Sequence, residues 1–94
     1  MNATVVVNPA ARGGAHTRAA ERAVARLTTL GIATTTVSGA SAAESTALLR
    51  HAVSGGTDAV IVVGGDGIIN LALQEVAGSA TPLGVVPAGN GNDF

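Results

Sequence analysis

Residues that could bind a phosphate or a metal ion gather at the end of one apolar run. Residues 59–63 are alanine, valine and isoleucine, and Gly64-Gly65-Asp66-Gly67 follows them directly. A run this short and this apolar predicts a strand buried on both faces. The glycines allow backbone N–H groups to approach a ligand closely. Because a carboxylate among such groups needs a bridging partner, Asp66 is a candidate contact for magnesium or for a sugar hydroxyl.

The apolar spacing becomes helical from Ile68 onward, which predicts a helix directly after the glycines. A strand, a glycine turn and a helix N-terminus in succession are typical of phosphate sites. Two plainer interpretations stay open, because glycine turns after strands are commonly only turns and Asp66 could simply cap the helix. The sequence lacks the Walker pattern, and Asn70 stands where a dinucleotide fingerprint has its third glycine.

Two more loops rich in glycine or asparagine follow predicted strands. Asn8-Pro9 ends the strand predicted over residues 4–7, and residues 89–93 follow the strand predicted over 83–86. Residues 10–14 are either a plain connection or a second phosphate-facing loop. Since parallel strands end at the same edge of a sheet, we expect all three loops to converge there. The candidate nucleotide-binding residues are Asn8, Pro9, Gly64, Gly65, Asp66, Gly67, Asn70, Gly89, Asn90, Gly91, Asn92 and Asp93, with Asp66 also the candidate metal ligand.

These motifs together resemble one enzyme family. Gly-Gly-Asp-Gly at a strand end is similar to the nucleotide signature of diacylglycerol, sphingosine and NAD kinases, and the segment 87–94 resembles Pro-x-Gly-Thr-x-Asn-Asp-Phe of bacterial diacylglycerol-kinase-like lipid kinases. Asn8-Pro9 followed by two glycines is a third match. Three positions depart from the family pattern: Ile68 and Asn90 replace threonines, and Leu71 replaces a glutamate.

The resemblance implies a lipid kinase that transfers the γ-phosphate of ATP to a lipid hydroxyl with Mg²⁺. It implies that residues 1–94 are the amino-terminal nucleotide-binding part, and that a following β-rich domain supplies the catalytic base. We therefore expect this chain alone to be inactive. Should it supply a base itself, the candidates are Asp58, Asp66, Glu75 and Asp93. The alternatives are an NAD-kinase-like enzyme and a truncated, non-catalytic nucleotide-binding module.

The remaining pattern alternates strands with helices. Helices are predicted over residues 15–30 and from Ser41 to about residue 53, where Ser41 and Glu44 fit a capping box. Between them, residues 32–38 predict a strand near an edge of the sheet. The order predicts a three-layer α/β/α fold, with a mainly parallel sheet of about four strands between helices.

Composition narrows the class of protein. The formal net charge of −1 gives no electrostatic reason to expect binding of nucleic acid. Disulfides and cysteine-based metal sites are excluded because the chain has no cysteine. No apolar run approaches the roughly 20 residues of a membrane-spanning helix, so a cytoplasmic protein is expected, peripheral at the inner membrane surface if its substrate is a lipid. Arg18, Arg22 and Arg26 share a helix face, which is either solvated or drawn to anionic lipid. His16 and His51 are expected on the surface. Oligomeric state is open, a homo-oligomer included.

Overall fold

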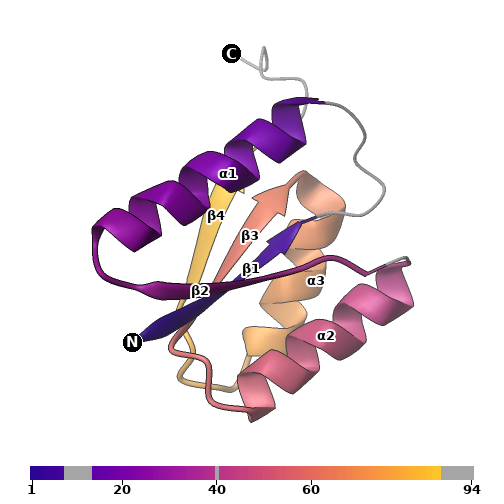
Figure 1. Ribbon diagram of the computed structural model, residues 1–94. Helices are drawn as coiled ribbons and strands as arrows, with labels where there is room; N and C mark the ends of the chain where they lie inside the picture. Colours follow the sequence, from indigo (N-terminus) through magenta and orange to yellow (C-terminus); the bar gives the residue numbers. More distant parts are fainter. Residues whose placement is uncertain (8–13, 40, 88–94) are drawn as a thin grey trace.

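The structure, a computed structural model, describes residues 1–7, 14–39 and 41–87, in which strands and helices alternate (Figure 1). The elements follow the predicted order, and their ends differ from the predicted ends by at most two residues. Their bounds are β1 (Asn2–Val7), α1 (Gly14–Thr29), β2 (Ala33–Val37), α2 (Ala42–Ser54), β3 (Ala59–Gly64), α3 (Asp66–Val76) and β4 (Leu83–Pro87).

The strands form one parallel sheet in the order β2-β1-β3-β4. Helix α1 lies on one face, and α2 and α3 lie on the other (Figure 1). The predicted three-layer α/β/α fold with a four-stranded parallel sheet is therefore confirmed, as is the position of β2 at an edge. The chain runs outward from the central strand β1 to β2, and in the opposite direction from the central strand β3 to β4. The helices that make these two connections, α1 and α3, therefore cover opposite faces of the sheet.

The main core lies between the sheet and the pair α2 and α3. It is made of β-branched side chains from the central strands and aliphatic side chains from the helices, because a strand covered on both faces must be apolar throughout. Its buried members are Val6, Leu49, Val60, Val62, Ile68 and Ala72.

On the outer surface, Arg50 of α2 donates to both carboxylate oxygens of Glu75 on α3 at 3.1 and 3.2 Å, and this hydrogen bond raises the pKa of Arg50. This exposed ion pair links α2 to α3 on the surface of the protein.

Helix α2 begins with a serine cap, as the sequence predicts. The Ser41 hydroxyl accepts a hydrogen bond from the Glu44 N–H at 3.2 Å. Removing the hydroxyl with Ser41→Ala leaves that N–H to water, so we expect the free energy of unfolding to fall by about 1 kcal/mol. Urea unfolding measures this loss. The control is Ser54→Ala at the exposed far end of the same helix, which should leave the urea midpoint unchanged; equal midpoints for the two variants would contradict the capping role.

No helix within residues 1–7, 14–39 and 41–87 is long and apolar enough to cross a membrane.

Candidate functional site

The carboxyl ends of three neighbouring strands meet at one edge of the sheet, which we call the carboxyl edge. Val7 of β1 pairs with Val63 of β3, and Gly64 pairs with Pro87 of β4. The described ends of these three strands therefore lie side by side, and the predicted convergence of the loops that follow them stays a prediction. The segments 8–13 and 88–94 lie outside the described residues. The predicted contacts Asn8, Pro9, Gly89, Asn90, Gly91, Asn92 and Asp93 lie in them, and so does Arg12.

Strand β3 passes into α3 through a single residue. Gly64 is buried and has a φ of 152°, a conformation that side chains disfavour. Gly65 is the N-cap residue, and its carbonyl accepts the Ile69 N–H at 3.1 Å, which closes the first turn. The first N–H groups of a helix have no partner inside it. Those of residues 66–68 therefore point out at the carboxyl edge, where the helix dipole also favours an anion.

Two glycines of this junction are not explained by packing against the described residues. A Cβ atom added at Gly65 or Gly67 would meet no atom of residues 1–7, 14–39 or 41–87 within 4 Å. Gly65 has φ −102°, which any residue adopts, so its backbone does not require glycine either. Both positions are exposed. The absence of side chains here leaves the N-terminus of α3 open to a ligand approaching from outside.

Asp66 lies at this opening. Its side chain is exposed in the first turn of α3, and no side chain caps the helix, because the N-cap is Gly65. The alternative that Asp66 is the capping residue is therefore wrong. Asn70 is exposed one turn further along α3, on the same face as Asp66. An exposed carboxylate beside free N–H groups can hold a cation that in turn binds an anion.

Two departures from the family pattern have a structural explanation. Ile68 is 3% exposed and belongs to the main core, and Leu71 is half-buried against it. Both aliphatic side chains pack beneath α3 instead of facing the carboxyl edge. At these two positions the side chains therefore serve core packing.

Two of the other carboxylates considered as bases lie away from the carboxyl edge, and Asp93 lies outside the described residues. Asp58 lies at the amino end of β3, at the other end of the strands from the carboxyl edge, and its Oδ2 accepts the Asn2 N–H at 2.7 Å. Glu75 binds Arg50. His51 is exposed in the last turn of α2, as expected. Within the described ranges, no group of three or more histidine, aspartate or glutamate side chains could hold a metal ion. Any metal at Asp66 would therefore need ligands from a bound phosphate or from the segments beyond the described residues.

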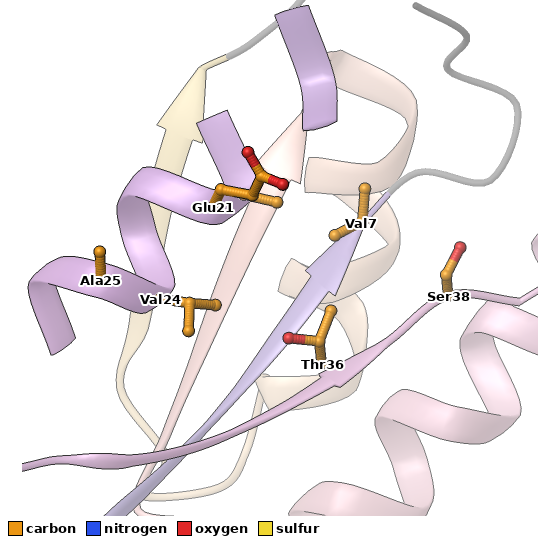
Figure 2. Close-up of a pocket in the computed structure, with 7 residues that line it drawn as sticks. Val7, Glu21, Val24, Ala25, Thr36 and Ser38 are labelled. Carbon is orange, nitrogen blue, oxygen red and sulfur yellow. The ribbon is translucent and has the colours of Figure 1, made fainter. Parts of the chain in front are cut away.

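A cavity of about 520 Å³ lies between α1 and the carboxyl ends of β1 and β2, and Figure 2 shows its lining side chains. Its wall is mainly aliphatic, with hydroxyl groups on the β2 side and one carboxylate on α1; the lining residues are Val7, Ala20, Glu21, Val24, Ala25, Thr36 and Ser38. Val7 in its wall pairs with Val63 of β3, so this part of the wall lies next to the strand that leads into α3. Sequence reasoning missed this cavity, since its residues come from separate elements and form no motif.

Comparisons with known proteins agree on one family. The model described as "Diacylglycerol kinase catalytic domain" matches residues 2–94. Two curated proteins named "Diacylglycerol kinase", from two strains of Mycobacterium tuberculosis, are each 47% identical over 90 residues. The alignment covers 96% of this chain and 29% of each relative, so the chain spans less than a third of their length.

Proposed function

The chain belongs to the diacylglycerol kinase catalytic domain family, and on that premise we propose that it forms the nucleotide-binding part of an ATP- and Mg²⁺-dependent lipid kinase. The observation that supports this most is the open β3–α3 junction, with glycines that neither packing nor backbone requires and an exposed carboxylate. In phosphoryl transfer the protein mainly neutralises charge and positions the reactants. A backbone anion site with a nearby cation ligand suits that task.

In this proposal the ATP phosphates lie on the N–H groups of residues 66–68. The Asp66 carboxylate would hold Mg²⁺ there, with Asn70 one turn away, and the cation would neutralise phosphate charge. The remaining candidate contacts, Asn8, Pro9 and residues 89–93, follow β1 and β4 in the sequence and would complete the nucleotide site. The chain has no lysine, so Arg12 is the cationic side chain available in segments 8–13 and 88–94. The comparison of ATP with and without Mg²⁺ distinguishes the metal bridge from direct backbone binding.

The cavity beside β1 supports an adenosine on the same edge. Its aliphatic wall offers an apolar surface for a flat base, while the hydroxyls of Thr36 and Ser38 and the Glu21 carboxylate provide hydrogen-bonding groups. Ligand sites commonly combine an apolar wall with a few such polar groups. The nucleotide would then extend across the carboxyl end of β1, from its phosphates at the β3–α3 junction to its adenine in the cavity.

The alignment leaves most of each relative unmatched. In our proposal, a part that corresponds to this unmatched region binds the acceptor lipid and supplies the general base. The relatives are more than three times as long as the aligned region, which leaves room for such a part. Arg18, Arg22 and Arg26 are exposed along α1 and would favour an anionic membrane surface. A cytoplasmic protein that acts at the inner membrane surface is consistent with these features. The relatives' names favour a diacylglycerol over the NAD-kinase alternative.

A phosphorylation assay tests this division of labour. The purified chain, incubated with labelled ATP, Mg²⁺ and diacylglycerol, should form no phosphatidic acid, because it cannot hold an acceptor hydroxyl in line with the phosphate. A chimaera in which this chain replaces the matched 90 residues of the Mycobacterium tuberculosis relative should form it. Phosphatidic acid from the chain alone would contradict the proposed division. A folded chimaera that binds ATP but phosphorylates no lipid would contradict the kinase function.

A further inference from the structure

The cavity beside β1 has one carboxylate in its wall, and we propose that this group, Glu21, selects the ribose of the bound nucleotide. The inference rests on the proposed nucleotide site and assigns one part of it. Glu21 lines the cavity (Figure 2) and forms no hydrogen bond or ion pair with a described residue, although Arg18 lies one turn before it on α1. Its two oxygens are therefore available to a ligand.

The order of residues along α1 and β2 places Glu21 on the side of the cavity that opens toward the carboxyl edge. Helix α1 connects two parallel strands, so it starts at the carboxyl edge and runs back along the sheet. Glu21 precedes Val24 and Ala25 by about one turn and therefore lies nearer to that edge. On the other wall, Ser38 follows the last residue of β2, whereas Thr36 lies inside the strand. Polar groups thus stand at the mouth, and the aliphatic part lies deeper.

A ribose suits this position in both place and chemistry. A nucleotide with its phosphates at the β3–α3 junction and its base in the aliphatic part of the cavity has its sugar at the mouth, beside Glu21. An ionised carboxylate only accepts hydrogen bonds, and the two neighbouring hydroxyls of a ribose supply two donors. Dinucleotide-binding folds use an acidic side chain for a ribose hydroxyl in the same way. Adenine matches a carboxylate less well, because its amino donor stands beside a ring nitrogen that accepts.

The negative charge of Glu21 separates this contact from a general electrostatic effect. A carboxylate near a triphosphate repels it, so a Glu21 that did not touch the sugar would weaken the binding of every nucleoside triphosphate alike. A hydrogen-bonded ribose offsets that repulsion only in nucleotides that carry both hydroxyls. The ratio of the affinities for ATP and for its deoxy analogue therefore reports the contact, because the charge acts equally on both nucleotides.

Isothermal titration calorimetry with ATP and with deoxy-ATP, each with Mg²⁺, measures that ratio. The parent chain should bind ATP about 10-fold more tightly than deoxy-ATP, the factor that corresponds to one hydrogen bond to a charged group. Glu21→Ala should bind the two nucleotides equally, and its fold is checked by circular dichroism, since position 21 is exposed on a helix. The matched control is Glu75→Ala, which removes the same side chain from the far end of α3 and should keep the preference of the parent chain.

The possible outcomes separate this inference from the proposed function. Equal affinities of the parent chain for ATP and deoxy-ATP, or a folded Glu21→Ala that keeps the preference for ATP, would overturn the role of Glu21 and leave the nucleotide site in place. A preference for GTP over ATP that disappears in Glu21→Ala would also overturn it, because a guanine base would then lie against the glutamate. No binding of any nucleotide by the parent chain would contradict the proposed function itself, and this inference with it.

Discussion

Gly65→Val is expected to weaken binding of ATP with Mg²⁺ by about 10- to 100-fold without unfolding the protein. A Cβ atom at position 65 meets no atom of the described part of the chain within 4 Å, and the backbone there has φ −102°, which valine adopts. The new methyl groups would therefore project from the N-cap of α3 into the space of the phosphate. Losing one or two hydrogen bonds to a charged group corresponds to a factor of this size.

Isothermal titration calorimetry with ATP and Mg²⁺ measures the effect, and circular dichroism checks the fold. Gly65→Ala should give a smaller loss, because one methyl group excludes less of the phosphate. The control is Ala47→Val on the exposed face of α2, which adds the same branched side chain away from the carboxyl edge. Unchanged affinity for folded Gly65→Val would place the nucleotide somewhere else.

Asp66→Asn is expected to remove the Mg²⁺ dependence of ATP binding. Asparagine keeps the size of the side chain but loses the charge that would hold the cation. Asp66 is exposed and does not cap α3, so the folded protein depends little on it; the favourable interaction with the helix dipole is worth about 0.3–1 kcal/mol. We therefore expect ATP affinity that no longer rises with added Mg²⁺, with only a small change in the midpoint of thermal unfolding.

A second carboxylate provides the control for that variant. Asp58→Asn removes one negative charge at the opposite edge of the sheet, where Asp58 accepts the Asn2 N–H. It should leave both ATP affinity and its Mg²⁺ dependence unchanged. The opposite pattern for Asp66→Asn, a large loss of stability with the Mg²⁺ dependence retained, would show that its carboxylate is structural.

The order of elements and the carboxyl edge could be predicted from local patterns. Short β-branched runs such as residues 59–63 are too short for helices and too apolar for loops, and a glycine or proline after each run marks where the strand ends. The start of α2 could be predicted from Ser41, because a capping serine accepts a hydrogen bond from the backbone of the helical turn that directly follows it. Parallel strands then place the following segments at one edge whatever their order in the sheet.

Features that depend on long-range packing could not be predicted this way. The strand order β2-β1-β3-β4 arises from pairing between segments far apart in the chain, such as Val7 with Val63. The apolar spacing places the start of α3 at Ile68, two residues too late, because the first two helical residues, Asp66 and Gly67, are not apolar and carry no periodic signal. The burial of Ile68 and Leu71 beneath α3 explains two family departures only once the core is known. The cavity beside β1 combines residues from α1, β1 and the β2 end, and no sequence motif joins them.

The central claim is that ATP binds at the β3–α3 junction of the carboxyl edge. An NMR titration of the ¹⁵N-labelled chain with ATP and Mg²⁺ tests it most directly, because it locates binding residue by residue. We predict saturable shifts of the backbone amides of residues 65–68 at the N-terminus of α3. Shifts confined to the opposite edge of the sheet, at Gly56, Thr57 and Ser79, or no shifts at residues 65–68 at saturating ATP, would contradict the account.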